Sequence, residues 1–522
     1  MHEIVTLQFG QQSNYIGTHY WNAQESYFTY GGQEESPVDH DISFRPGIAP
    51  DGSDTFTPRA LIYDLKGAFG SLRKINALYE AQDDAAAGSL WSGPTTTQTA
   101  PQIPPSPYQQ HLDAGLSPPP LTSQTVRYWS DYARIYHHPR SLIQLPDLSL
   151  GDRLLPFENW DLGTELFENL DREHDLLDRD LRPWVEECDQ LQGFQIFAGA
   201  DDAWGGFAAR WVERMEDEYG RKSVWVWGME DGVRGAREKQ LQKLVNIAKS
   251  LYELSTQASV YVPVSSKPIS APAYLNLDET SRWDTSGLQA AAIESMTLPS
   301  RLRTSGGQRG TLQDMEAAFN SDGNRRIAKF EFSVADEDAL KETLDSRVPQ
   351  MNDSRTKVRI TDAQGTGDEP PQLAEFDMDL SASDFPKTTQ RRLGRKTHVF
   401  GGAETSRGLW KTEEEVNADK GALRNRFDEG PKIHRYHTPL LFPILDSFPR
   451  IFRVSNATSS GKVAVRSALS TSTSVADRIR NIEQVVRRLV SLDEREALCN
   501  GLRNICEEYE EGWDSESEEE DD

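Results

Sequence analysis

The residues of this chain that could do chemistry begin at its first glycine. An alternating apolar run from Ile4 to Phe9 stops at Gly10, and a helical pattern that includes Ile16 follows. A strand, a glycine turn and a helix N-terminus can bind a phosphate, because free backbone N–H groups and the helix dipole both point at the anion. Most glycine turns between a strand and a helix bind nothing, so a purely structural turn stays open as the alternative.

Further patterns predict the elements that position this turn. Strand and helix patterns alternate over residues 1–80 and 126–289, with helices expected at 162–181 and 237–254 and a strand at 191–197. Such alternation is typical of an α/β domain, here a nucleotide-binding-type domain, whose mainly parallel sheet is flanked by helices.

The second half of the chain predicts a different architecture. We expect a second, α+β domain over residues 290–470, with strands at 329–334 and 357–360. C-terminal helices are expected over 471–506, and a capping box at Ser474–Asp477 would begin the first of them. The apolar stripe of that helix predicts docking onto the core, although a partner helix could use the same surface.

Three segments have compositions that set them apart. Residues 81–125 are rich in Pro, Ser and Thr, and their prolines exclude a regular helix or central strand, so we expect a solvated low-complexity insertion. Residues 507–522 hold 11 acids and no Lys or Arg, which predicts a disordered acidic tail. A basic cluster within residues 387–396 could contact anionic lipid or acidic partners, or balance nearby acidic segments as a solvated loop.

The composition excludes several classes of function. The 522 residues carry a formal net charge of -27 at pH 7, so phosphate repulsion argues against direct nucleic-acid binding. Three cysteines are too few for a disulfide framework and are typical of a reducing compartment, and no metal-binding motif occurs. The sequence has no apolar run long enough for a transmembrane helix, and its N-terminus lacks the features of a signal or transit peptide. Any membrane contact is therefore expected to be peripheral.

The opening segment resembles that of tubulins, and the resemblance continues in order along the first half of the chain. Pro58–Leu65 is similar to the second strand and loop of the tubulin fold, and Glu187–Gln195 is similar to the strand before its glycine-rich phosphate loop. The resemblance implies a guanine-nucleotide pocket for GTP or GDP. The residues that it places in this pocket are Gly10, Gln11, Asn14, Asp64, Gly205, Gly206 and Asn246.

Several departures from tubulins affect the phosphate chemistry. Tubulins carry a run of the type Gly-Gly-Gly-Thr-Gly-Ser-Gly after this strand, whereas this chain has Asp201, Asp202 and Trp204 in the corresponding stretch. Two carboxylates where an anionic phosphate would lie cost energy, and a cation would be needed to offset them. Lys66 replaces an acidic residue of the second loop. The Gly-x-x-Asn-x-Asp element of polymerising members, which completes a neighbour's hydrolytic site, does not occur between residues 265 and 332.

A tubulin-like chain with an altered phosphate loop resembles the Misato family. Four stretches spread over most of the chain carry this resemblance: Trp129–Tyr132, His138–Leu142, Ser259–Pro263 and Tyr436–Pro443. Membership would imply a role in mitochondrial distribution, morphology and mitochondrial DNA inheritance rather than a defined reaction. It would also imply protein partners on the cytoskeleton or the mitochondrial surface, and a location on the cytosolic side of the mitochondrion and in the cytoplasm.

Two hypotheses follow. The first is a non-catalytic, tubulin-like adapter that positions and partitions mitochondria with their DNA, because the scaffold is kept while the phosphate loop is altered. The second is a divergent GTP-binding protein or GTPase with a cytoskeletal role, which would use Gly10, Gln11, Asn14, Asp64 and Asn246. The loss of the glycine-hydroxyl loop favours the first hypothesis.

Overall fold

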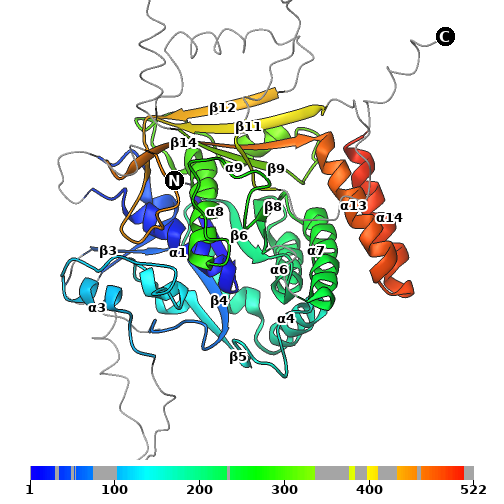
Figure 1. Cartoon of the computed structure of the whole chain (residues 1–522), viewed down its shortest axis with the longest axis horizontal. Coiled ribbons are helices and arrows are strands. Elements are labelled where there is room, and N and C mark those ends of the chain that lie inside the picture. Colours follow the sequence, from blue (N-terminus) through cyan, green and yellow to red (C-terminus); the bar gives the residue numbers. More distant parts are fainter. Residues whose placement is uncertain are drawn as a thin grey trace, which may run out of the picture.

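Two sheets, with helices packed on and between them, form the body of the molecule (Figure 1). The computed structural model describes residues 2–29, 35–48, 52, 54–73, 103–231, 236–335, 376–381, 397–408, 432–454 and 460–510. The expected strand at 357–360, the basic cluster at 387–396 and residues 511–522 of the tail lie outside these ranges.

The first sheet is parallel throughout, as the alternating strand and helix patterns predict. Among the described residues it has six strands, and each hydrogen-bonds its neighbours in the parallel sense. Their spatial order is β5 (Leu142–Ser149), β4 (Ala60–Lys66), β1 (Glu3–Phe9), β6 (Leu191–Gly199), β7 (Ser223–Glu230) and β8 (Val260–Ser265). All carboxyl ends therefore meet at one edge, which is where ligands bind in open α/β sheets.

Helices cover both faces of this sheet, so its strands read as near-continuous apolar runs. One face carries α1 (Gln11–Glu25) and α8 (Arg282–Thr297), which pack against each other. The other face carries α4 (Trp160–His174), α6 (Ala203–Tyr219) and α7 (Arg237–Gln257). The α/β fold class is confirmed by this arrangement.

The expected helices and strand of this domain are largely confirmed. The strand at 191–197 is β6, and the helix at 237–254 is α7, which continues to Gln257. The single helix expected at 162–181 is wrong, because the chain turns at Asp175, whose φ of 47° lies in the left-handed region. A π-helical turn (Leu177–Leu181) and the short α5 (Arg182–Glu186) follow it.

The second sheet is mostly antiparallel. Its order is β10 (Met378–Asp379), β9 (Lys329–Ala335), β14 (Lys462–Ser472), β11 (Val399–Arg407) and β12 (Lys432–Thr438). Of the described strand pairs in this second sheet, only β11–β12 is parallel. The expected strand at 329–334 is confirmed as β9. Ala290, near which the second domain was expected to begin, lies inside α8. This helix packs on both α1 and β14 and so belongs to both halves.

Smaller elements complete the described structure. A hairpin pairs β2 (Phe44–Ile48) with β3 (Asp54–Pro58), and β13 (Phe442–Pro443) pairs antiparallel with the start of β14. Helix α9 (Leu312–Phe319) packs on β11 and β12. Short 3-10 turns occupy His40–Ile42, Trp129–Tyr132, Pro139–Ser141 and Leu298–Arg301.

The proline-rich segment holds a helix, although its prolines were expected to exclude one. Helix α3 (Pro107–Asp113) begins with Pro107 in its first turn, where a missing N–H costs nothing. The Ser106 hydroxyl caps the helix by accepting from the N–H of Gln109 at 3.2 Å. Tyr108 is buried and donates to Asp446 at 3.1 Å. The described part of this segment, from residue 103, is thus partly helical.

Two C-terminal helices, α13 (Thr473–Leu489) and α14 (Leu492–Glu508), pack against α7. The capping box expected at Ser474–Asp477 is wrong. The N-cap is Ser472, whose hydroxyl pairs with that of Ser474 at 2.7 Å instead of capping the backbone. The apolar stripe of α13 faces the core, as expected, since Ile479, Ile482 and Val486 are fully buried.

The ordered chain continues further than the acidic composition predicts. Tyr509, inside the segment expected to be a disordered tail, is fully buried. Its hydroxyl donates to the Ile327 carbonyl and accepts from the Ile327 N–H, both at 2.8 Å.

Replacing Tyr509 by Phe is expected to lower the free energy of unfolding by about 1–3 kcal/mol, because both backbone groups of Ile327 then lose a buried partner. Urea denaturation of the full chain measures this change. The control is Tyr136→Phe at an exposed tyrosine. Equal stabilities for the two variants would contradict the assigned role of Tyr509.

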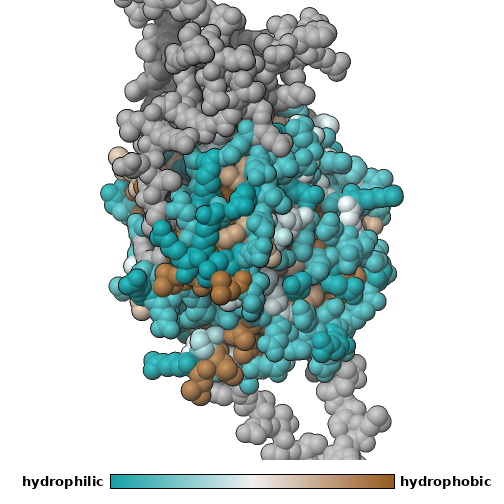
Figure 2. Space-filling view, turned by 90° about the vertical axis from the view of Figure 1, so that its right-hand side faces the viewer, coloured by the Kyte–Doolittle hydropathy of each residue, from teal (hydrophilic) through white to brown (hydrophobic). Residues whose placement is uncertain are grey.

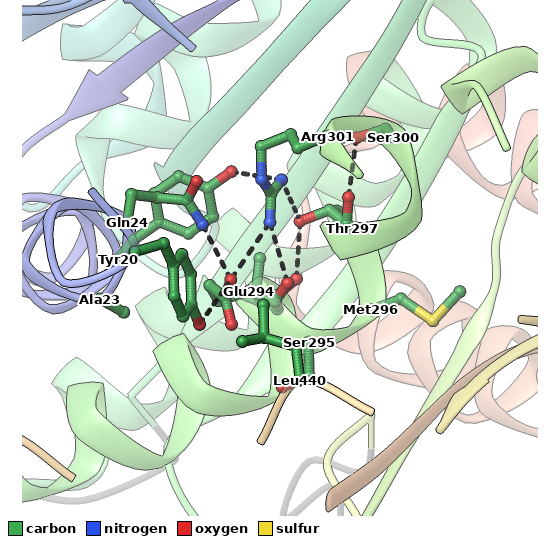
Figure 3. Close-up of polar contacts among 12 residues, drawn as sticks. Tyr20, Ala23, Gln24, Glu294, Ser295, Met296, Thr297, Ser300, Arg301 and Leu440 are labelled. Carbon is green, nitrogen blue, oxygen red and sulfur yellow. Dashed lines mark hydrogen bonds and ion pairs between the residues drawn. The ribbon is translucent and has the colours of Figure 1, made fainter. Parts of the chain in front are cut away.

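A buried ionic cluster joins the two halves (Figure 3). Glu294 of α8 pairs with Arg301 at 3.4 Å and with Arg407 of β11, and all three side chains are fully buried. Gln24 of α1 donates to Glu294 at 2.8 Å, and Tyr20 accepts from Arg301 at 2.7 Å. The cluster therefore links α1, α8 and the second sheet through one carboxylate.

Candidate functional site

Three of the residues expected in a nucleotide pocket meet at the carboxyl ends of β1 and β4. Asp64 is fully buried. Its Oδ2 accepts from Nε2 of Gln11 at 2.5 Å, from Nδ2 of Asn14 at 2.7 Å and from Nε1 of Trp129 at 3.3 Å. Burial raises the pKa of Asp64 to about 6, although hydrogen bonds from Leu65, Asn14 and Gln11 oppose the rise. The side-chain N–H groups of Gln11, Asn14 and Trp129 therefore find their hydrogen-bond acceptor within the cluster.

Several polar atoms at the start of α1, beside this cluster, lack hydrogen-bond partners. Gln12 donates to Oε1 of Gln289 on α8 at 2.9 Å. Within the described part of the chain, Oε1 of Gln12, Oγ of Ser13 and Oδ1 of Asn14 are buried without a hydrogen-bond partner. Such atoms usually bind water or a ligand. Gln12, Ser13 and Gln289 were not among the expected pocket residues, although the first two lie between Gln11 and Asn14 in the sequence.

The expected phosphate turn is covered by an aromatic ring. Gly10 adopts a φ of 84°, and a Cβ atom there would lie 2.3 Å from Nε1 of Trp204. The Trp204 side chain is buried and makes edge-to-face contacts with Phe157 and Phe207, with centroids 5.0 and 5.6 Å apart. The Trp204 indole, in the first turn of α6, therefore packs directly on the β1–α1 turn.

Two carboxylates hold the start of α6. Asp202 caps the helix, since its Oδ1 accepts from the N–H of Trp204 at 2.9 Å. Asp201 is buried and accepts from Nζ of Lys243 at 2.9 Å and from the N–H of Asp231 at 3.1 Å. Burial and the neighbouring Asp201 raise the pKa of Asp202 to about 7, and burial raises the pKa of Asp201 against the attraction of Lys243.

These pKa shifts predict a pH-dependent stability. The pKa of Asp202 lies above the unperturbed value of 3.8, so between about pH 4 and 7 the folded chain holds protons that the unfolded chain has lost. Stability from this group therefore falls as the pH rises through that window. Asp202→Asn keeps the capping oxygen and removes the charge. It is expected to stabilise the fold by on the order of 1–2 kcal/mol at pH 8 and much less at pH 5.

Thermal melting at pH 5, 6, 7 and 8 measures this difference. Asp147→Asn, at an exposed carboxylate, is the control and should follow the parent profile. Parallel pH profiles for Asp202→Asn and the parent would contradict the assignment.

The remaining expected residues serve helix packing. Asn246 of α7 donates to the carbonyls of Glu158 at 2.7 Å and Asp201 at 3.0 Å, and accepts from the N–H of Trp160 at 3.2 Å. Gly205 and Gly206 lie inside α6, not in a tight turn before it. A Cβ atom would lie 2.1 Å from the Ser250 hydroxyl at Gly205 and 2.1 Å from the Trp160 carbonyl at Gly206. Within the described structure, these contacts join α4, α6, α7 and the turn before α6, and none of them is with Asp64.

The residues at the β6–α6 turn do not fit a phosphate chain. An indole covers the first glycine turn, a carboxylate already caps α6, and a second carboxylate lies beside it. A phosphate there would meet like charge at close range with Lys243 already engaged by Asp201. The start of α1 offers neutral acceptors instead, which suit a donor group.

The parallel sheet, the glycine turn of β1 and the second sheet packed through α8 define a tubulin-like protein. Residues 2–114 match the Misato Segment II tubulin-like domain, and residues 118–302 match a tubulin domain. A protein named DML1 from Phaeosphaeria nodorum is 54% identical over the full length of both chains, and dml-1 of Neurospora crassa is 45% identical over the same extent. The dml1 protein of Schizosaccharomyces pombe is 32% identical over 64% of this chain and 73% of its own. The chain belongs to the DML1 family of Misato-type, tubulin-like proteins.

Membrane-spanning elements are not found in the described structure. Each helix that it contains is too short or too polar to cross a bilayer.

Proposed function

We propose that this chain is a non-catalytic, tubulin-like protein that acts in mitochondrial distribution and morphology and in partitioning of mitochondria and mitochondrial DNA. It works through protein partners of the cytoskeleton or the mitochondrial surface, peripherally on the cytosolic side of the mitochondrion and in the cytoplasm. The observation that carries the non-catalytic part is the packing of Trp204 on Gly10. The mitochondrial part rests on family membership and the motifs shared with Misato proteins.

The chemistry of the candidate site supports a scaffold. Transfer of a phosphoryl group needs donors and cations around the phosphate. Here Asp201 and Asp202 occupy the turn, and Lys243 is held by Asp201. Asp64 is held by three side-chain donors, so its carboxylate stabilises the β1–α1 and β4 turns.

A second candidate function is a divergent GTP-binding protein or GTPase with a cytoskeletal role. The unpartnered acceptor atoms of Gln12, Ser13 and Asn14 favour it, since a bound base could donate to them. This alternative requires the Trp204 ring to leave Gly10 before a phosphate could approach the turn.

Nucleotide content tests the choice between these functions. The purified full chain is denatured and its released small molecules are separated, and labelled GTP is titrated into the protein. We expect no stoichiometric guanine nucleotide, no saturable GTP binding, and phosphate release no faster than from the Gln11→Ala, Asp64→Ala variant. One equivalent of bound nucleotide, or turnover that this variant loses, would establish the second function instead.

Depletion in cells tests the mitochondrial role. Loss of the protein is expected to disturb mitochondrial shape and the segregation of mitochondrial DNA, and the parent chain should restore both. A folded Gln11→Ala variant should restore them equally well if the site is not catalytic. Normal mitochondria and normal DNA segregation after depletion would refute the proposal.

A further inference from the structure

A run of three prolines stands at the surface after α3. Residues 116–120 read Leu-Ser-Pro-Pro-Pro and belong to neither a helix nor a strand. Leu116 is 59% exposed, and Ser117 and Pro120 are exposed as well. We name residues 116–120 the proline arm.

The arm lies on a different side of the molecule from the C-terminal helices. In Figure 1, α3, from which the arm leaves, lies at the opposite end of the molecule from α13 and α14. The α13–α14 side faces the viewer in Figure 2. It is mostly hydrophilic and carries its apolar groups in small separate areas, which is ordinary for a protein surface.

The proline rings fix the backbone of the arm. Each ring holds its own φ at about −65° and restricts the residue before it to extended conformations. Ser117–Pro120 therefore follow a polyproline II helix, which has about three residues per turn and no internal hydrogen bonds. Within the described structure, the carbonyl oxygens of Pro118, Pro119 and Pro120 accept no hydrogen bond. They stay open to donors of a partner.

The three edges of this helix have different surroundings. Leu121 packs against the core, and Pro118, three residues earlier, lies along the same edge. Pro119, which is half-buried, and Pro120, which is exposed, lie on the other two edges. The arm therefore rests on the body along one edge and presents the other two.

Helix α3 holds the start of the arm. The helix ends in a Schellman motif at Gly115, whose φ of 66° lies in the left-handed region. In this motif the N–H of Leu116 donates to the carbonyl of His111 at 2.8 Å. Nδ1 of His111 donates in turn to the carbonyl of Ser117 at 2.9 Å. One residue of α3 thus fixes the first two residues of the arm.

A turn at residues 122–125 holds the other end. The N–H of Thr122 donates to Oγ1 of Thr125 at 2.9 Å. The N–H groups of Thr125 and Val126 donate to the Thr122 carbonyl at 3.0 and 3.2 Å. Because both ends are fixed, the arm is ordered before a partner binds, and binding costs little conformational entropy.

The residues around the arm indicate the kind of partner. Residues 114–126 contain no charged side chain, so recognition depends on shape and apolar contact and not on ion pairs. Aromatic-lined grooves of SH3, WW and EVH1 domains bind polyproline II segments. Residues 114–126 lack the Pro-x-x-Pro spacing that SH3 ligands use, and a run of three prolines suits a shorter groove.

We propose that the proline arm is the ligand of a WW-type domain in a partner protein. Aromatic rings of the domain pack on the two edges that carry Pro119 and Pro120, and its Tyr and Trp side chains donate to the open carbonyl oxygens. This interaction does not depend on the nucleotide chemistry of the candidate site or on the mitochondrial role.

A labelled domain tests the proposal on the full chain. The probe is a fluorescein-labelled WW domain that binds free polyproline peptides. The first control is the same domain with its groove tryptophan replaced by alanine. Anisotropy is expected to show saturable binding of the chain by the parent domain, and binding by the control domain should be weaker by about tenfold or more.

Two pairs of prolines locate the binding. Pro119→Ala, Pro120→Ala should weaken binding by about tenfold or more, while Pro104→Ala, Pro105→Ala should leave it unchanged. The control pair is also consecutive and exposed, but its carbonyl oxygens already accept hydrogen bonds from other side chains. Both variants remove the same two rings, so a loss confined to the first variant reports contact with the arm.

Three results would overturn the proposal. One is the absence of saturable binding to the full chain. Another is equal binding by the two double variants, or equal binding by the parent and control domains. The third is tighter binding of an SH3 domain than of the WW domain, because the partner would then be of a different class.

Discussion

Replacing Glu294 by Gln is expected to lower the free energy of unfolding by about 3–5 kcal/mol, the largest loss we expect from a change of one charge. The carboxylate pairs with both Arg301 and Arg407, and each of these side chains is fully buried. Without it, two guanidinium groups remain in the interior with no negative charge between them. Glutamine keeps the shape of the site, so a loss of this size reports charge and not volume.

Urea denaturation of the full chain measures the loss, with a matched exposed pair as control. Asp178→Asn breaks a 2.6 Å pair with Arg182 in which both side chains are well exposed, and it should cost less than about 1 kcal/mol. Arg407→Met should destabilise the Glu294→Gln variant less than it destabilises the parent, because it then removes an uncompensated cation. A Glu294→Gln loss as small as that of the control would contradict the cluster's role.

The second large effect is expected at the crossing of α4 and α6. A Cβ atom at Gly163 would lie 1.7 Å from the backbone carbonyl oxygen of Ala203, and one at Gly206 would lie 2.1 Å from that of Trp160. Each helix thus places a glycine against the main chain of the other, and main-chain atoms cannot rotate away. Gly163→Ala is expected to cost about 3 kcal/mol or more, since overpacking of a core forces helices apart.

Gly501→Ala provides the comparison for this prediction. Its Cβ atom would also be crowded, but by the outer ring atoms of Tyr252, a side chain that can move. Helix propensity favours alanine over glycine by about 1 kcal/mol, so this variant should be nearly neutral or stabilising. Melting temperatures of the two variants test the contrast. A Gly163→Ala protein as stable as Gly501→Ala would show that the helices do not cross this closely.

Local patterns were sufficient for much of the fold. The strands β1 and β6 are apolar runs, and α7 has a continuous apolar face, so these elements could be predicted. The predictions were wrong where a single residue ended or began a helix. Asp175 ends α4 by adopting a left-handed conformation, and Pro107 begins α3 although prolines exclude helix interiors.

The candidate site was predictable only in part. Gln11 and Asn14 follow β1, and Asp64 lies near the carboxyl end of the adjacent parallel strand β4, so their meeting at one edge follows from the topology. The contact of Trp204 with Gly10 joins turns far apart in the sequence and leaves no local pattern. The same holds for Glu294 and Arg407, which are separated by 113 positions. From the sequence alone, a charged residue in an apolar stretch is expected at the surface, because its buried partner of opposite charge is not apparent.

The place of β14 in the second sheet has a consequence for how the protein is made. This strand lies between β9 and β11 and pairs with both of them. Residues 336–461 separate β9 from β14, and a ribosome needs on the order of 10 s to synthesise them. During that time β9, and β11 once it has been synthesised, lack their shared neighbour, and unpaired strand edges invite association between chains. The emerging chain is therefore expected to need shielding by a chaperone until residue 472 has left the ribosome.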